Sequence, residues 1–196
     1  MRANGGEAPS RAFAVTSTSP GKSGEGANPR ILAAMLRAIL QGLVLRREAY
    51  LRMVLAREGV ADAALVVAVV YLLLAVPGIL GSAGLVATAG FVVGGVFGWI
   101  VLAGLTYLTG RHVLEGDGTF PSVMAASGLA FPPLLLSLAL RPFLPALVAL
   151  AAASAWLLAC LWQAARVSLD LSRAKAAAAA AGGYGGWLVL SALSVI

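Results

Sequence analysis

The side chains most suggestive of chemistry lie in a short polar loop near residue 115. The single histidine, His112, stands beside Arg111, with Glu115 and Asp117 a few residues further on. One imidazole and two carboxylates could bind a metal weakly, but catalytic and structural metal sites normally use more ligands in a fixed geometry. Loops of this composition usually bind nothing, so we predict neither a metal nor a cofactor.

Other residue patterns typical of catalysis are missing from the sequence. Gly116, Asp117 and Gly118 form a tight turn, but no Walker lysine follows them, so a phosphate loop is not predicted. The one cysteine, Cys160, lies in an apolar run without a second histidine to activate it. Asp62 lies in the first turn of another apolar run, where a carboxylate favours a helix N-terminus. We therefore predict that the protein is not an enzyme.

The composition indicates which elements hold these residues. Of the 196 residues, 60% are hydrophobic and only 11% are charged, and the mean hydropathy is +0.92. Ordinary soluble domains contain roughly 25% charged residues. We predict an all-α polytopic membrane protein, a bundle of five transmembrane helices preceded by a basic amphipathic helix. The net charge of +6 does not indicate a nucleic-acid partner, because the basic residues stand at the ends of apolar runs.

The chain divides into three parts. Residues 1–29 are rich in Gly, Ser, Ala and Pro and predict a disordered tail. A transit peptide, or a later start at Met35 or Met53, is the alternative explanation of this segment. Residues 30–59 carry apolar side chains at helical spacing together with several arginines, which predicts a helix on the cytoplasmic membrane surface or packed under the bundle. Residues 60–196 should form the five-helix transmembrane domain.

Each apolar run approaches the roughly 20 residues that cross a bilayer. The predicted spans are 60–80, 85–109, 123–140, 143–165 and 176–196. A polar loop, 110–122, precedes the third span, and a short amphipathic link, 166–175, precedes the fifth.

Charge predicts the orientation of the domain. Five spans place thirteen of the fourteen Lys and Arg residues on one side of the membrane and leave Arg141 opposite. Because cytoplasmic segments carry the Lys/Arg excess, we predict a cytoplasmic N-terminus and an outside C-terminus. The preference for Arg over Lys and the abundance of Ala and Gly suit a bacterial gene, which indicates the cytoplasmic (inner) membrane.

A double proline, Pro132 and Pro133, lies inside the third span. Proline removes a backbone donor and clashes with the preceding turn, so we predict a kink that leaves the carbonyls of Gly128 and Leu129 without their usual donors. A neighbouring helix, a water or Ser127 should then cover them, and Gly128 should admit a close helix. A hinge that moves when a partner docks is the alternative to a purely structural kink.

Two glycine series occur at helical spacing, Gly90, Gly94 and Gly98 in the second span and Gly182 and Gly186 in the fifth. Small residues on one face let membrane helices approach closely. We expect them to pack helices within the chain, with a homo-oligomer interface as the alternative.

The arrangement from about residue 52 onward resembles the YIP domain family of Ypt/Rab-interacting-protein-like membrane proteins, prokaryotic type. The resemblance rests on the order of elements, the loop Gly116-Asp117-Gly118-Thr119-Phe120 followed by Pro121, and the proline-bearing third span with Pro132 and Pro133. The family pattern G-Y-x-x-x-P is matched by Gly128 and Pro132, with Leu129 in place of tyrosine. The amphipathic link at 167–174 is also similar. The D-L-Y-G-P motif of eukaryotic members is absent, which argues against binding of Rab-type GTPases.

The resemblance implies a non-enzymatic membrane scaffold or protein-interaction module, with a role in membrane organisation or of a trafficking-like kind. Its partners would be the lipid bilayer and other membrane or cytoplasmic proteins. A small transporter or permease subunit is the alternative, although the spans carry almost no ionisable groups at mid-membrane depth. An intramembrane enzyme is disfavoured by the missing His, Cys and acid clusters.

Overall fold

The computed structural model describes residues 45–81 and 84–193, and the described chain is helical without strands. The predicted tail 1–29 and residues 30–44 of the predicted surface helix lie outside the described residues. Five helical segments are long and apolar enough to cross a membrane. This confirms the all-α, five-span prediction.

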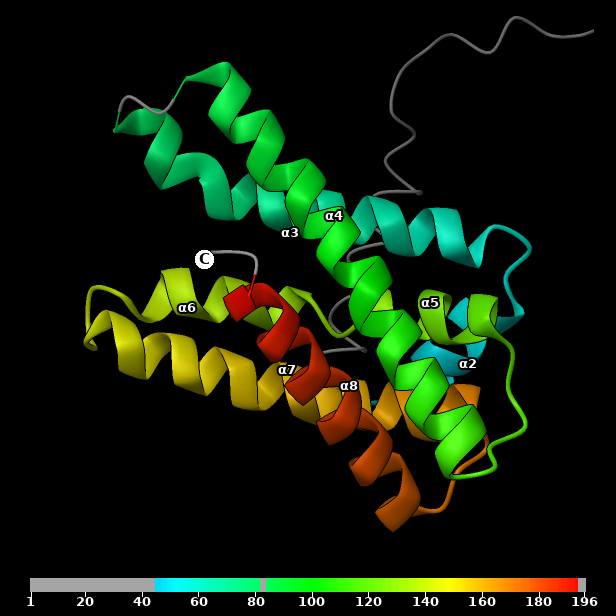
Figure 1. Ribbon diagram of the computed structural model, residues 1–196. Helices are drawn as coiled ribbons and strands as arrows, with labels where there is room; N and C mark the ends of the chain where they lie inside the picture. The colour runs from blue at the N-terminus through cyan, green and yellow to red at the C-terminus, as the bar shows by residue number, and fades with distance from the viewer. Residues whose placement is uncertain (1–44, 82–83, 194–196) are drawn as a thin grey trace, which may run out of the picture.

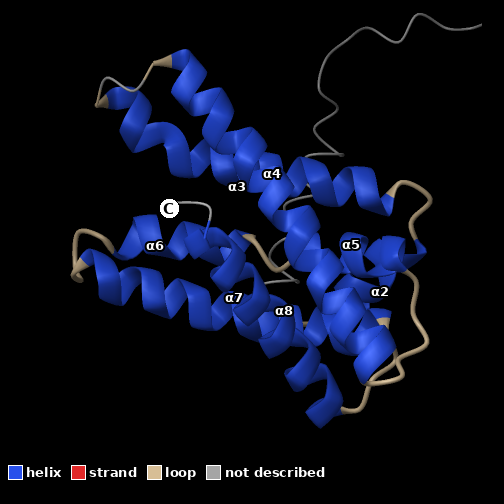
Figure 2. Cartoon of the chain, in the orientation of Figure 1, coloured by secondary structure: helices blue, strands red, loops and turns tan. Residues whose placement is uncertain are grey.

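The helices follow in the order shown in Figure 1. A short helix, α2 (Arg47–Leu55), precedes the first span, α3 (Gly59–Leu80). The remaining elements are α4 (Leu85–Leu108), η1 (Thr109–Val113), α5 (Phe120–Gly128), η2 (Pro132–Leu134), α6 (Leu135–Leu140), α7 (Ala146–Ser168) and α8 (Arg173–Leu193). Figure 2 shows that only short loops join them within the described residues.

Several helix ends differ from the sequence prediction for local reasons. The second span continues through the π-helical turn η1 to Val113. The fourth begins at Ala146 instead of residue 143, because Pro142 and Pro145 interrupt the turn after α6. The predicted link 166–175 contracts to 169–172. Ser172 stands at the start of α8, where its carbonyl accepts from the Ala176 amide at 2.9 Å.

The third span is interrupted at the double proline. The helix ends at Gly128, and Pro132 and Pro133 form a 3-10 turn before α6 begins. The carbonyl of Gly128, predicted to lack a donor, accepts from the Phe131 amide at 3.3 Å in a tightened turn. The Ser127 hydroxyl donates to the carbonyl of Met124 at 3.0 Å, so it does not serve the carbonyl of Gly128 or Leu129 as expected.

Of the five spans of the described chain, the interrupted third span is the most buried. Figure 1 shows the α3–α4 hairpin and the α6–α7 hairpin with their tips apart, while α8 runs between α4 and α7, with which it packs. The central core joins all five spans through buried residues that include Val67, Trp99, Phe131, Leu161 and Ala180. The outer ends of the hairpins expose large apolar side chains, as lipid-facing surfaces do.

Candidate functional site

Three segments distant in sequence lie at one end of the bundle, which we call the loop end. They are α2, the loop 114–119 between η1 and α5, and the link 169–172 between α7 and α8. The amide of Asp117 donates to the carbonyl of Leu169 at 3.0 Å, and the Lys175 ammonium donates to the carbonyl of Leu114 at 3.0 Å. These bonds fix the loop against the link and the start of α8.

The two glycines of the predicted loop motif lie directly against that link. A Cβ at Gly118 would overlap the Ser168 carbonyl, and one at Gly116 would come within 3.1 Å of both the Gly110 carbonyl oxygen and the Leu169 Cβ. The amide of Gly116 also donates to the carbonyl of Gly110 at 2.9 Å. The close packing of the loop on the link therefore explains the two glycines of the motif without any role in binding phosphate.

The charged residues of the loop also act on its own backbone. The Arg111 guanidinium donates to the carbonyl of Gly116 and forms an ion pair with Asp117 at 3.2 Å. Glu115 and Asp170 adopt left-handed backbone angles (φ of 59° and 49°) just after the ends of η1 and α7. Such residues commonly terminate helices. Among the described residues, no three His, Cys, Asp or Glu side chains gather as a metal site would require.

The next two motif residues, Phe120 and Pro121, begin α5. The amide of Ser122 donates to the Thr119 hydroxyl oxygen at 3.4 Å, which caps this helix, and Pro121 fits its first turn. The Phe120 ring packs against the ring of Tyr107 on α4, with centroids 5.7 Å apart. These contacts orient the start of the third span.

The short helix α2 is docked on the bundle instead of lying free on its surface. Its Ala49 and Tyr50 are buried among Ala126, Leu129 and Ala164 of the third and fourth spans. Burial raises the pKa of the Tyr50 hydroxyl far above its usual value, and the neighbouring Cys160 adds to the rise. Arg47, Glu48 and Arg52 are exposed on α2, so the helix presents charged groups while its apolar face is held in the protein.

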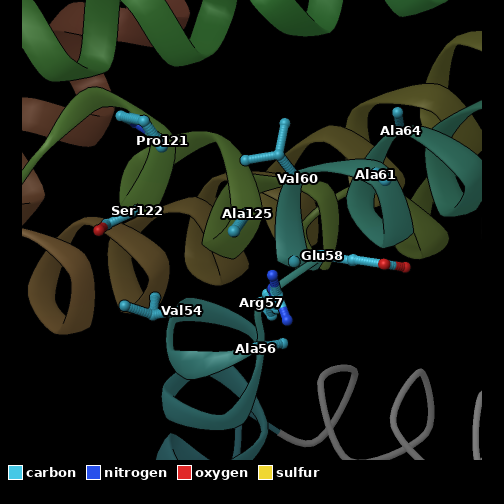
Figure 3. Close-up of a pocket in the computed structure, with 11 residues that line it drawn as sticks. Val54, Ala56, Arg57, Glu58, Val60, Ala61, Ala64, Pro121, Ser122 and Ala125 are labelled. Carbon is cyan, nitrogen blue, oxygen red and sulfur yellow. The ribbon is translucent and has the colours of Figure 1, made fainter.

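A pocket of about 540 Å³ opens at the loop end (Figure 3). Val54 and Ala56 lie on one side, from α2 and the turn after it, and Ser122 and Ala125 of α5 lie on another. The start of α3 completes it with small apolar side chains, and the charged pair Arg57 and Glu58 stands at the turn. The pocket is thus apolar inside and carries both charge signs at its edge.

The residues around the proline turn hold spans together. A Cβ at Gly128 would come within 2.8 Å of the Ala63 Cα on α3, and both Pro132 and Pro133 are buried. The buried Trp99 indole of α4 donates to the Ser127 hydroxyl at 2.9 Å. The sequence prediction did not select Trp99, because its partner Ser127 is revealed only by the packing of α4 on α5.

The glycine series only partly match their predicted role. Gly90 and Gly94 are exposed, and a methyl group on either would meet no other helix of the described chain within 4 Å, which corrects the expectation that they pack helices within the chain. The other three do face neighbours. A Cβ at Gly98 would lie 3.2 Å from the Trp187 indole nitrogen, one at Gly182 would lie 2.9 Å from the Thr109 methyl, and one at Gly186 would lie 3.2 Å from Leu105.

In α4 and α8, the glycines that lie closest to a neighbouring helix are one residue away from those predicted. Gly95 lies under the ring of Tyr71 on α3, and Gly183 lies against Thr106 on α4. The i, i+4 pattern located the correct helices but not the face that each turns to its neighbour. That face is determined by a side chain on the neighbouring helix, Tyr71 for Gly95 and Thr106 for Gly183. The spacing of glycines within one helix carries no information about that partner.

Fold and site together define a multi-pass membrane protein whose loops and short helix are bound tightly to one end of a five-span bundle. The Yip1 domain matches residues 42–196 of this sequence, from just before α2 to the end of the chain. The chain therefore belongs to the Yip1 domain family, which is not known as enzymatic. No curated protein and no solved structure is significantly similar to it.

Proposed function

We propose that this Yip1 family protein acts without catalysis, as a membrane scaffold that binds other proteins at its loop end. The observation that carries the proposal is the pocket between α2, the start of α3 and the start of α5. It offers small apolar side chains in a concave surface, the kind of surface into which a partner places an apolar anchor residue.

The distribution of charged residues supports the loop end as the surface that binds a partner. Among the described residues, all basic side chains except Arg141 belong to the loop end: Arg46, Arg47, Arg52, Arg57, Arg111, Arg166, Arg173 and Lys175. The same end also carries the acidic residues Glu48, Glu58, Asp62, Glu115, Asp117 and Asp170, so its net charge is only weakly positive. A partner whose apolar anchor is flanked by charged residues of both signs would match this surface. Charge complementarity of this kind speeds encounter and sets orientation.

The same charge distribution supports a cytoplasmic loop end in a bacterial inner membrane. Cytoplasmic loops carry the Lys/Arg excess, so the N-terminus would be inside and the C-terminus outside. Reporter fusions after Gly118 and after Ile196 should then report opposite sides of the membrane. Reporters on the same side would refute this topology.

Copurification tests the proposed role. The full chain is extracted in mild detergent, and the copurifying proteins are identified and quantified for three forms: the natural chain, Ala61→Trp in the pocket, and Ala89→Trp on the exposed face of α4. We expect a stoichiometric partner that is retained by Ala89→Trp and lost from Ala61→Trp. Equal recovery with both variants would contradict a docking role for the pocket.

A further inference from the structure

A second cavity, of about 260 Å³, lies inside the membrane-spanning part of the bundle, away from the loop end. Residues of α3, α4, α7, α8 and the segment around the proline turn line it. Ser154 stands eight residues after the start of α7, and Tyr184 stands nine residues before the end of α8. At 1.5 Å per residue, both lie roughly 12–14 Å from those helix ends, close to the middle of a bilayer.

The walls of this cavity are apolar and rich in aromatic rings. Six leucines contribute, together with two ring pairs. Tyr71 and Phe131 have centroids 6.1 Å apart on one side, and Tyr184 and Trp187 have centroids 5.8 Å apart on another. Flat aromatic faces of this kind favour a planar apolar group between them.

Four hydrogen-bonding groups in the lining have no partner elsewhere in the described chain. They are the hydroxyls of Tyr71, Ser154 and Tyr184 and the indole N–H of Trp187, whereas the Ser137 hydroxyl already donates to the carbonyl of Leu134 at 2.6 Å. The indole can only donate, and a phenol donates more readily than it accepts. In hydrocarbon such donors are costly unless an acceptor reaches them.

The lining excludes other kinds of occupant. No Asp, Glu, Lys, Arg or His of the described chain lines the cavity, so a charged ligand would have no counter-ion. Water needs two to four polar partners each, and mostly leucine and aromatic walls do not provide them for a cavity of this size. A neutral molecule with an apolar body and acceptor oxygens satisfies both the walls and the donors.

We propose that this cavity binds a membrane-soluble molecule with carbonyl oxygens on a planar, uncharged head, the chemistry of a quinone. The ring head lies between the two aromatic pairs, its carbonyl oxygens accept from Tyr184, Trp187 or Ser154, and its apolar tail follows the leucines toward the lipid. The site is separate from the loop-end pocket, so a negative result in the test below would not count against the proposed scaffold role.

Quenching of tryptophan fluorescence by decylubiquinone tests the site. The full chain is reconstituted in quinone-free phosphatidylcholine nanodiscs and titrated, with Trp187 as the reporter at the cavity. Ser154→Leu fills the cavity, and Ala155→Leu adds the same side chain on the exposed face of α7. We expect saturable quenching, with Kd raised at least tenfold by Ser154→Leu and unchanged by Ala155→Leu.

A second pair of variants keeps the test decisive if Ser154→Leu does not fold. Tyr184→Phe removes one donor and keeps the ring, and it should weaken binding about two- to tenfold, the value of one hydrogen bond. Tyr107→Phe, on a tyrosine outside the cavity, should change nothing. Quenching that rises linearly with quinone and equally in all variants would overturn the proposal. Equal displacement by dodecylbenzene, which lacks carbonyl groups, would overturn the acceptor requirement.

Discussion

Trp99 of α4 and Ser127 of α5 form a buried relay: the indole nitrogen donates to the serine hydroxyl at 2.9 Å, and that hydroxyl donates to the carbonyl of Met124 at 3.0 Å. Both side chains are almost fully buried. The bond lies one residue before the end of α5, where the third span is interrupted. It therefore ties the second span to the third at the position where the third span loses its own helical hydrogen bonds.

Ser127→Ala should destabilise the protein by about 1–3 kcal/mol, because the buried Trp99 indole loses its acceptor. Denaturant unfolding in detergent, followed by circular dichroism, measures the change. In a Trp99→Phe background the same serine substitution should cost much less, because no donor is left unpaired. Equal costs in the two backgrounds would show that this hydrogen bond does not couple the spans.

Gly128→Ala should be destabilising by about 1–3 kcal/mol, because the added methyl would press on Ala63 at the contact of α3 with α5. Gly90→Ala is the matched control on an exposed helical surface. It should be neutral or stabilising by up to about 1 kcal/mol, the difference in helix propensity. Thermal unfolding in detergent checks both, and a Gly90→Ala variant that is the less stable of the two would reverse our assignment of the packing face.

Gly118→Ala should loosen the loop 114–119 from the link 169–172, since its methyl would overlap the Ser168 carbonyl. Faster cleavage of the loop by a protease added to the detergent-solubilised protein is the expected result. Gly84→Ala, at a glycine with no neighbour within 4 Å, should leave proteolysis unchanged. If Gly118→Ala is as resistant as the natural chain, the close contact of loop and link is not needed to order the loop.

The docking of α2 should weaken at high pH. The pKa of Tyr50 is near 10 in an unfolded chain and much higher when buried in the docked helix. The protonated phenol is therefore favoured by docking. Its stabilising contribution is complete below about pH 10 and declines as pH rises above that value toward the folded pKa.

Labelling of the single cysteine reports this change, because Cys160 is buried beside Tyr50. The labelling rate of the natural chain should rise between about pH 10 and 11 by more than that of Tyr50→Phe, since only the natural chain carries the phenol that ionises there. The phenylalanine variant corrects for the intrinsic pH dependence of the thiol reaction. Parallel pH profiles in the two proteins would mean that ionisation of Tyr50 does not release α2.

The sequence was sufficient for the spans and for the position of the interruption, because long apolar runs and proline have strong local effects. The sequence was insufficient where the role of a residue depends on a packing partner that is distant in sequence. The choice of Gly95 over Gly94 depends on Tyr71 of another helix, and the role of Gly118 depends on the carbonyl of Ser168, far along the chain. The link ends before residue 173 because the Ser172 carbonyl accepts from the Ala176 amide and so begins α8 earlier than hydropathy alone indicated.

Site-specific photo-crosslinking in intact cells tests the scaffold role most directly. A benzophenone amino acid is placed at Val54 in the loop-end pocket, or at Val93 on the exposed face of α4. We predict a discrete protein adduct from Val54 that is absent from Val93 and that disappears when Ala61→Trp fills the pocket. Absence of a protein adduct at Val54, or the same adducts at both positions, would contradict the proposal that the loop end binds a protein partner.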